Sequence, residues 1–188
     1  MKNEKTINYI LLGLLAHEPA SGYDLKKRID VSFSHFWPLS YGQIYPSLKT
    51  LLAEGYIEFC GSNQKDGPAR KLYRTTAEGL SALQEYLQRP ELSQYFRNEL
   101  LVKLFFGGEV NPEVSLRHLN QFQAECQQKL ALFSAFEMEL DELIQADPDH
   151  LFINLSVSFG RQSMETYIRW AQDAERKIME LNQERFNA

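Results

Sequence analysis

The stretch SYGQIYPSLKTLLAEG, which spans residues 40–55, decides the fold. Ser40 and Gln43 have capping-box spacing, so we expect the serine hydroxyl to accept from the Gln43 N–H while the glutamine side chain reaches back to Ser40. At 100° per residue, one helix face collects large apolar side chains: Tyr41, Ile44, Leu48, Leu51 and Leu52. The opposite face collects small, polar and cationic residues: Gly42, Gln43, Pro46, Lys49 and Thr50.

That second face carries no carboxylate until Glu54 in the last turn. Phosphates repel acids and bulky side chains block approach, so such a face suits the major groove of DNA. Gly55 ends the helix, and the extended run 56–60 begins at once. A winged helix joins its recognition helix to its wing in this order. Pro46 lies inside the predicted helix, where it should forfeit its hydrogen bond to Gly42 and bend the helix.

The flanking residues predict the other elements of a winged helix. Residues 6–17 have helical apolar spacing, and Ser21 is placed to cap a second helix that runs to about residue 33. A polar loop over residues 61–69 leads into a return strand over residues 70–75, whose cations flank the loop tip. Thr75 and Glu78 have capping-box spacing and predict a fourth helix that stops before Pro90.

Residues 91–188 predict a second, all-helical domain. A helix is expected over residues 91–106, and Asn111-Pro112-Glu113 is a strong start for a long one. Its apolar side chains follow a 3-4 spacing: Leu119, Phe122, Cys126, Phe133, Phe136, Leu140 and Leu143. Asp147-Pro148-Asp149 starts a last helix with a second heptad: Met164, Tyr167, Ala171, Ala174, Ile178 and Leu181. Such seams are usually completed by packing onto another chain or domain.

Charge is distributed unevenly between the two halves. The net charge of −5 argues against a protein that coats nucleic acid in general, but residues 1–90 carry +2 and residues 91–188 carry −7. The basic groups therefore lie in the half with the candidate recognition helix. Two cysteines, Cys60 and Cys126, are too few for a zinc motif or a disulfide framework, which favours a reducing, cytoplasmic setting.

The sequence also disfavours several other classes of protein. The apolar run over residues 9–16 is too short to span a membrane, and Glu4 with no clear cleavage site argues against a signal peptide. No phosphate-binding glycine loop, zinc-binding HExxH or nucleophile elbow occurs, so we expect no enzyme, cofactor or metal site. The four histidines show no ligand spacing.

The residues of the first half resemble the PadR family of bacterial transcriptional regulators. The matching pieces occur in order and at family spacing over most of residues 7–80: ILLGLL at 10–15, SGYDL at 21–25, GQIYPSL at 42–48, LAEGYI at 52–57 and YRTTAEG at 73–79. The helical second half resembles the longer tail that one PadR branch shares with the virulence-gene activator AphA. The expected fold is mainly α: a winged helix-turn-helix domain with a two-stranded β-wing over residues 1–90, then an all-α antiparallel helical dimerisation domain over residues 91–188.

The resemblance implies a homodimer that binds double-stranded DNA at a roughly palindromic site. Carried over by position, the DNA-side residues are Tyr23, Ser40, Gln43, Tyr45, Lys49, Arg70 and Lys71. The dimer contacts fall on the last helix at Met164, Tyr167, Trp170, Ala171, Ile178 and Leu181. A repressor is expected from family frequency. The operator, the regulated genes and the sign of regulation do not follow from the sequence.

Several of these residues have two interpretations. Gln43 is suited to bind adenine bidentately, or its amide is consumed by the capping box. Tyr45 and Tyr23 either pack in the core with the hydroxyl outward or contact DNA. Lys49 and Arg70, with Lys71, are interpreted as phosphate contacts, and the alternative is a solvated cation.

Trp37 and Trp170, near Phe33, Phe36 and Tyr167, are weak candidates for a pocket that binds a small aromatic effector. Core and interface packing is the simpler interpretation. Two alternatives to a DNA-binding regulator stay open. One is a helical interaction module whose winged helix binds protein, and the other is a protein selected chiefly as a small-molecule sensor.

Overall fold

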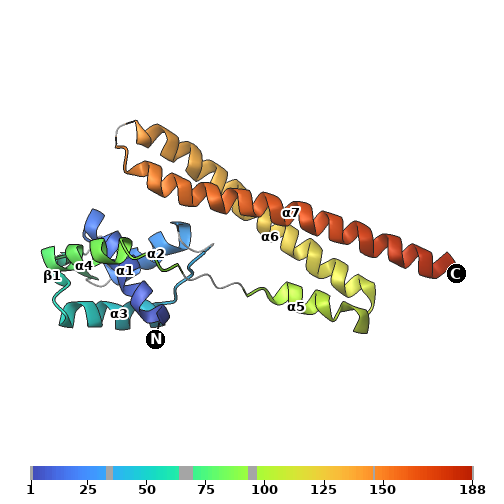
Figure 1. The fold of residues 1–188 in the computed structure, drawn as a ribbon, viewed down its shortest axis with the longest axis horizontal. Coiled ribbons are helices and arrows are strands. Elements are labelled where there is room, and N and C mark those ends of the chain that lie inside the picture. The colour runs from blue at the N-terminus through green and yellow to red at the C-terminus, as the bar shows by residue number, and fades with distance from the viewer. Residues whose placement is uncertain (1, 33–35, 64–69, 93–96, 146, 188) are drawn as a thin grey trace. The chain divides into compact units, whose positions relative to one another are not determined.

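The computed structural model describes residues 2–32, 36–63, 70–92, 97–145 and 147–187. The chain divides into two compact units, Met1–Ser93 and Gln94–Ala188 (Figure 1). The sequence placed the division after residue 90. Among the described residues, no helix has both the length and the apolar character needed to cross a bilayer.

The first unit is a winged helix, as predicted. In chain order its elements are α1 (Lys2–His17), α2 (Gly22–Ser32), α3 (Tyr41–Ala53), β1 (Ile57–Asn63), β2 (Arg70–Thr75) and α4 (Ala77–Leu87). Apolar side chains from the first three helices, the segments that precede α2 and α3, and β1 form one core: Ile7, Leu11, Leu12, Leu15, Ala20, Leu25, Ile29, Leu39, Ile44, Leu48, Leu51 and Ile57. The helical faces predicted to be apolar therefore meet in this core.

The wing is an antiparallel pair of strands whose register runs from Ile57 opposite Thr75 to Asn63 opposite Arg70. β1 is longer than predicted, since Gly61 to Asn63 belong to the strand and not to the loop. A register irregularity between Phe59 and Gly61 lets the strand continue, because Gly61 adopts a φ of 149° that other residues rarely reach. The remainder of the predicted loop, residues 64–69, lies outside the described residues.

The junction between the wing and α4 differs by one residue from the prediction. Thr76, not Thr75, is the N-cap of α4, and its hydroxyl accepts from the Gly79 N–H at 3.1 Å. Thr75 is still the last residue of β2, and its hydroxyl donates to the Leu12 carbonyl at 3.0 Å. Gly79 is required here, because a Cβ at this position would lie 2.0 Å from the Tyr56 carbonyl oxygen.

The second unit is built from α5 (Glu99–Phe105), a 3-10 turn η1 (Gly107–Glu109) and the long helices α6 (Pro112–Ile144) and α7 (His150–Asn187). α5 begins later than the helix predicted over residues 91–106: residues 91, 92, 97 and 98 are not helical, and residues 93–96 lie outside the described residues. Asn98 is extended and caps α5 by accepting from the Leu100 N–H at 3.0 Å, so the helix begins only after it. The predicted cap Asn111 is confirmed by its bond from the Glu113 N–H at 2.9 Å.

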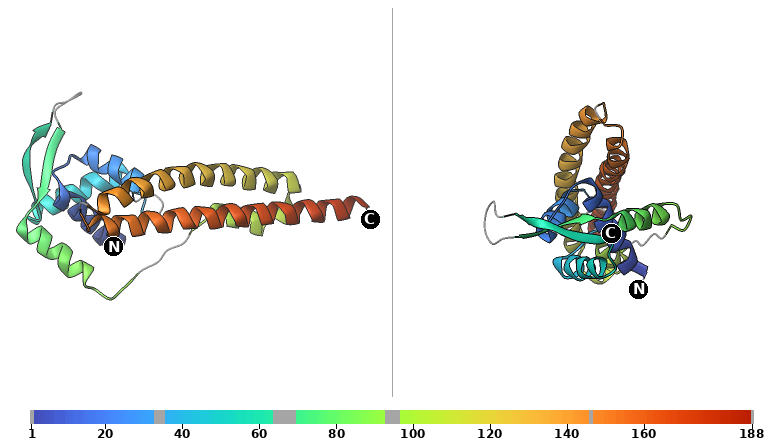
Figure 2. Two further views of the ribbon diagram at one scale, coloured as in Figure 1. Left: turned by 90° about the horizontal axis from the view of Figure 1, so that it is seen from above. Right: turned by 90° about the vertical axis from the view of Figure 1, so that its left-hand side faces the viewer.

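The two long helices run antiparallel along most of their lengths (Figures 1 and 2). Along each helix the seam buries an apolar side chain at every seventh residue: Leu119, Cys126, Phe133 and Leu140 on α6, and Val157, Met164 and Ala171 on α7. Leu143, predicted in the seam, is 40% exposed near the end of α6. Burial raises the pKa of the Cys126 thiol, so this cysteine is held neutral.

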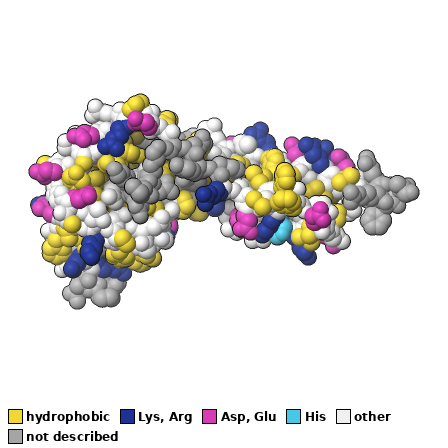
Figure 3. All heavy atoms as spheres, turned by 60° about the horizontal axis from the view of Figure 1, so that its bottom comes forward, with side chains coloured by type: hydrophobic (Ala, Val, Ile, Leu, Met, Phe, Trp, Pro, Cys, Tyr) yellow, Lys and Arg dark blue, Asp and Glu magenta, His cyan; other side chains and the backbone are white. Residues whose placement is uncertain are grey.

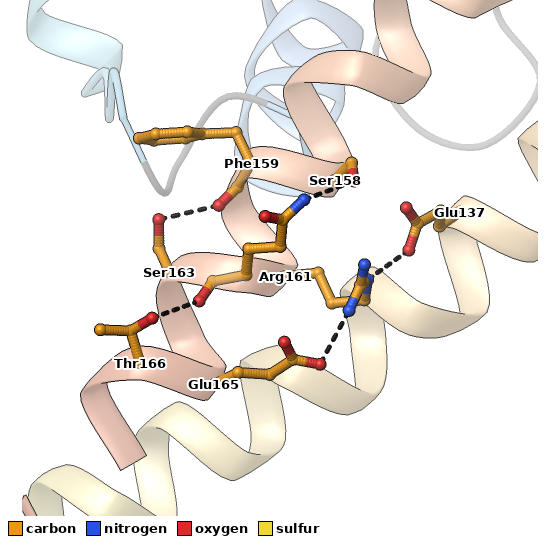
Figure 4. A network of polar contacts seen from close by, with 8 residues as sticks. Glu137, Ser158, Phe159, Arg161, Ser163, Glu165 and Thr166 are labelled. Atoms are coloured by element: carbon orange, nitrogen blue, oxygen red, sulfur yellow. Dashed lines mark hydrogen bonds and ion pairs between the residues drawn. The ribbon is translucent and has the colours of Figure 1, made fainter. Parts of the chain in front are cut away.

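Polar bridges fix the register of α6 against α7. Arg161 on α7 donates to Glu137 on α6 at 2.5 Å and to Glu165 on its own helix at 2.7 Å (Figure 4). A further bridge lies on each side of Arg161: Asn154 Nδ2 donates to Asp141 at 2.7 Å, and Gln123 Nε2 donates to Glu175 at 2.7 Å. These pairings bring together residues from opposite ends of the two helices, as an antiparallel hairpin requires.

Two of the predicted dimer contacts need correction. Met164 is 6% exposed and Ala171 is fully buried inside the single chain, so neither presents a surface to a partner. The heptad that they occupy is completed by α6 of the same chain. Trp170 and Leu181 are 38% and 49% exposed, so they retain surface outside this seam.

Candidate nucleic-acid interface

Helix α3 exposes the face that the sequence predicted to enter a groove. Ile44, Leu48 and Leu51 are buried, whereas Tyr41 and Leu52, both predicted on the apolar face, are each 44% exposed. Every residue of the opposite face is exposed: Gly42, Gln43, Pro46, Lys49 and Thr50. The helix continues through Pro46 without interruption. The interface therefore has the polar, acid-free surface that the pattern indicated.

The start of α3 is fixed by Ser40 and Gln43. Ser40 is the N-cap, and the predicted capping box is present. The Gln43 Oε1 accepts both from the Ser40 N–H and from the Ser40 hydroxyl, each at 3.0 Å. The glutamine side chain is therefore held by the cap while it remains exposed on the surface of the helix.

The ring of Tyr45 lies against the beginning of α2. A Cβ added to Gly22 would meet the Tyr45 Cε1 atom at 2.7 Å, so a glycine is needed for the two helices to approach this closely. Tyr45 also stacks on Tyr41 with ring centroids 6.2 Å apart, and it remains 52% exposed. Tyr45 thus packs against α2 and borders the exposed face at once.

Arg70, the first residue of β2, is held by two side chains of α2. Its guanidinium carbon lies 3.8 Å from the centroid of the Tyr23 ring, and its Nη1 lies 4.0 Å from the Asp24 carboxylate. A two-bond backbone bridge between Ala20 and Tyr73, at 3.1 and 3.0 Å, joins the same segments. The base of the wing is therefore attached to the start of α2.

Asp24 supports the candidate interface, and the sequence did not single it out. Its carboxylate accepts from the Ser21 N–H at 3.1 Å and from the Ser21 hydroxyl at 2.6 Å, while the Ser21 Oγ caps α2 through the Asp24 N–H at 3.2 Å. Burial alone would raise the pKa of Asp24, but the Ser21 hydrogen bonds and the charges of Arg70 and Arg28 lower it below its ordinary value. The spacing of Ser21 and Asp24 repeats that of Ser40 and Gln43, and this was the available signal.

The cations near the interface divide into paired and unpaired groups. Lys26 forms an ion pair with Asp30, and Arg28 pairs with Glu18 at 2.6 Å. Arg74 pairs with Glu58 across the wing at 2.6 Å. Within the part of the chain that the structure describes, Lys27, Lys49 and Lys71 are exposed and form no ion pair. These three are the cations most available to phosphate, and Lys27 was not among the predicted DNA-side residues.

The aromatic ligand candidates pack separately in their own units. Trp37 packs against the core of the first unit, and Trp170 makes an edge contact with Phe122 at 6.2 Å in the second. Tyr167 also contacts Phe122, with ring centroids 5.9 Å apart. Phe33 lies outside the described residues. These contacts agree with the simpler interpretation, in which the rings serve packing.

Two family models match this chain. Residues 11–85 match the transcriptional regulator PadR-like family, and residues 96–178 match the virulence activator alpha C-terminal domain. The first match contains the whole of α2, α3 and the wing. The second contains α5, α6 and most of α7. The two models thus meet close to the division between the two compact units.

The chain is similar to the negative transcriptional regulator PadR of Bacillus subtilis, with 32% identity over 103 residues that cover 54% of this chain and 57% of that one. The chain spans about half the length of the curated relatives it matches. Bacillus subtilis PadR in complex with operator DNA has the same fold, with a TM-score of 0.75, 23% identity, and coverage of 92% and 99% of the two chains.

The same regulator in complex with p-coumaric acid gives a TM-score of 0.69 at 24% identity and covers 92% of this chain and 98% of that one. The virulence activator AphA of Vibrio cholerae gives a TM-score of 0.70 at 22% identity, with coverage of 93% and 99%. The family models, the sequence relative and the shared fold agree with the motifs of α1 to α4. Residues 11–85 of the chain therefore form a domain of the PadR-like family of transcriptional regulators, followed over residues 96–178 by a virulence activator alpha C-terminal domain.

Proposed function

We propose that this protein is a sequence-specific DNA-binding regulator that acts as a homodimer on a palindromic operator, and that it is a repressor. The observation that carries the proposal is the exposed face of α3, which bears Lys49 and no acid before Glu54. Lys71 on the adjoining wing adds a second exposed cation that forms no ion pair with any residue that the structure describes. The negative regulator among its relatives supports the sign of regulation. A regulator of a bacterial chromosome works in the cytoplasm.

A salt-titrated binding assay on a promoter near the gene tests DNA binding. Phosphate contacts release counterions, so affinity should fall steeply with salt and should exceed affinity for random duplex. The double substitution Lys49→Ala with Arg70→Ala should abolish binding and leave the oligomeric state unchanged. A flat salt dependence with no preference over random duplex would contradict the proposal and favour a winged helix that binds protein.

The homodimer is supported by apolar surface on the second unit. Phe152, Leu155 and Phe159 follow one another at helical spacing on α7 and are 69%, 58% and 62% exposed. Phe105 and Phe106 at the end of α5 are 82% and 61% exposed. Figure 3 shows hydrophobic side chains gathered on the surface of this unit, and Figure 4 shows Phe159 pointing away from Arg161 and Glu137. Exposed apolar clusters of this kind mark association surfaces.

Dimerisation through this surface is tested by Leu155→Glu with Phe159→Glu, measured by sedimentation velocity. The double variant should sediment as a monomer. The control Gln127→Glu, at an exposed polar position on α6, should leave the oligomeric state unchanged. A monomer binds one half-site only, so its operator affinity should fall strongly. The two half-sites of a palindromic operator lie about 34 Å apart on one face of DNA, and only a dimer places a recognition helix at each of them.

The proposal includes release by a small aromatic effector. A relative binds p-coumaric acid, as its solved complex states. In this chain a hollow of about 190 Å³ lies between α5 and α6, and its lining residues are Glu99, Leu100, Lys103, His118, Gln121, Phe122 and Glu125. Phe122 offers a ring to an aromatic acid, and Lys103, which pairs with Glu99 at 3.1 Å, would have to exchange that partner for the acid. Trp170 touches Phe122, so its fluorescence should change when a phenolic acid enters, and Phe122→Ala should remove the change.

A further inference from the structure

The amide of Gln43 is oriented by the capping box before any DNA arrives. Its Oε1 accepts two hydrogen bonds, from the N–H and the hydroxyl of Ser40, each at 3.0 Å. A backbone N–H only donates, so the oxygen of the amide and not its nitrogen must face Ser40. Both lone pairs of Oε1 are then used.

The nitrogen of the same amide is left free. Among the described residues, no group accepts from the Gln43 Nε2, and the side chain is exposed on the face of α3 that carries Lys49 and Thr50. Nε2 carries two N–H groups, which are donors only. The cap thus converts a side chain that both donates and accepts into one that offers donors alone to the solvent side.

We propose, resting on the DNA-binding function above, that Gln43 is a specificity-determining residue that reads hydrogen-bond acceptors in the major groove. Guanine presents the N7 and O6 acceptors and thymine presents O4, whereas cytosine presents only the N4 donor. Guanine, with two adjacent acceptors, and thymine are therefore preferred at the base that faces Gln43, adenine offers only N7 beside its N6 donor, and cytosine is rejected. The bidentate contact with adenine is excluded, because it needs the Oε1 that Ser40 occupies.

A bidentate adenine contact would require the cap to open. The Ser40 N–H would then lose its partner at the first turn of α3, where such donors have no intrahelical acceptor. The base contact would form at the expense of two hydrogen bonds already present. The donor contact through Nε2 requires no such rearrangement, and this difference is why the geometry favours it.

Gln43→Glu separates the two roles of the side chain. A carboxylate completes the same capping box and is favoured at the positive end of the helix dipole, so the variant should keep or raise the Tm. It offers the groove an acceptor in place of the donors. Gln43→Met keeps the size of the side chain and loses both roles, so its Tm should fall below that of the unmodified protein.

Selection from a randomised duplex pool, followed by binding titrations, tests the inference. The unmodified protein should enrich guanine or thymine at one position in each half-site, with cytosine there weakening binding roughly 5-fold or more. Gln43→Glu should reverse this preference at that position alone, since a carboxylate accepts from cytosine N4, and Gln43→Met should show none. Overall affinity of Gln43→Glu should fall, because the carboxylate faces phosphates.

Two results would overturn the inference while the proposed function stands. One is an identical preference of all three proteins at every position. The other is an adenine at the Gln43 position whose replacement by a purine without the 6-amino group weakens binding, since that amino group would be donating to Oε1. If the unmodified protein enriches no sequence at all, the proposed function fails and the inference fails with it.

Discussion

The guanidinium carbon of Arg70 lies 3.8 Å from the centroid of the Tyr23 ring, so the first residue of β2 stacks on the first turn of α2. Tyr23 is 44% exposed, and the Arg70 guanidinium lies over its ring. A residue expected to bind phosphate is thereby held in place by a neighbouring helix. Under the proposed function, Arg70 would meet DNA with part of its conformational freedom already lost, which would lower the entropic cost of the contact.

Removal of the Tyr23 ring should weaken both the wing and the DNA contact. Tyr23→Ala should lower the unfolding free energy by about 0.5–1 kcal/mol, the usual strength of an exposed cation–π contact, and should weaken DNA binding. Tyr23→Phe keeps the ring and should retain the stability. Thermal unfolding and a binding titration on both variants provide the check. Equal affinity of the alanine and phenylalanine variants would mean that the ring does not position Arg70.

Asp24 should make stability depend on pH in the acid range. Its pKa is lower in the folded state than the ordinary value of 3.8, so the stabilisation that it provides is complete above about pH 4. As pH falls through the lower folded pKa, the carboxylate takes up a proton and this stabilisation is lost. The Asp24→Asn variant has no carboxyl group at this position to take up a proton. The difference in unfolding free energy between the two proteins should therefore shrink below pH 4, as measured by urea unfolding at several pH values.

Lys49 and Lys71 should each contribute one phosphate contact. Substitution of either by alanine should lower the slope of log affinity against log salt by roughly 1 and weaken binding to all sequences alike. Lys129, an exposed lysine on α6, is the matched control and should leave the slope unchanged. A loss confined to one operator sequence would instead assign the lysine to a base edge.

Gly79 and Gly13 should respond in opposite directions to the same substitution. Gly79→Ala would place a Cβ 2.0 Å from the Tyr56 carbonyl oxygen, which only a backbone shift can relieve, and should cost about 1–3 kcal/mol. Gly13→Ala meets only the Leu83 side chain, at 3.9 Å, and should stabilise α1 by about 0.5–1 kcal/mol. Thermal unfolding of the two variants measures both effects, and a stable Gly79→Ala protein would contradict the packing at this turn.

The sequence predicted the elements that rest on local chemistry. The capping pairs at Ser40 and Asn111 act within four residues and are confirmed. The apolar face of α3 depends on helical period alone and is confirmed for Ile44, Leu48 and Leu51, whereas Tyr41 and Leu52 are exposed. The cap of α4 was wrong by one residue because Thr75 and Thr76 are chemically alike. Thr75 is assigned to the strand by its pairing with Ile57 and by the tertiary bond from its hydroxyl to the Leu12 carbonyl.

The sequence pattern did not predict contacts between residues that lie far apart in the chain. Arg70 stacks on Tyr23, which lies 47 residues earlier in the chain, and no rule based on local spacing predicts this contact. The burial of Met164 and Ala171 was misjudged for a similar reason. A heptad predicts that a seam exists but does not state whether the partner helix comes from the same chain. The two helices here are long enough to complete the seam themselves.

Pro46 has no N–H, so the hydrogen bond that would end on the Gly42 carbonyl is not formed, although α3 continues through this point. The first turn of α3 is consequently joined to the rest of the helix by one bond fewer. Local opening of that turn should require less free energy than opening of the later turns. Amide hydrogen exchange should therefore be faster at Ile44 and Tyr45 than at Leu51. The first turn of α3 can then change its conformation to fit a DNA groove while the later turns, which are packed in the core, stay folded.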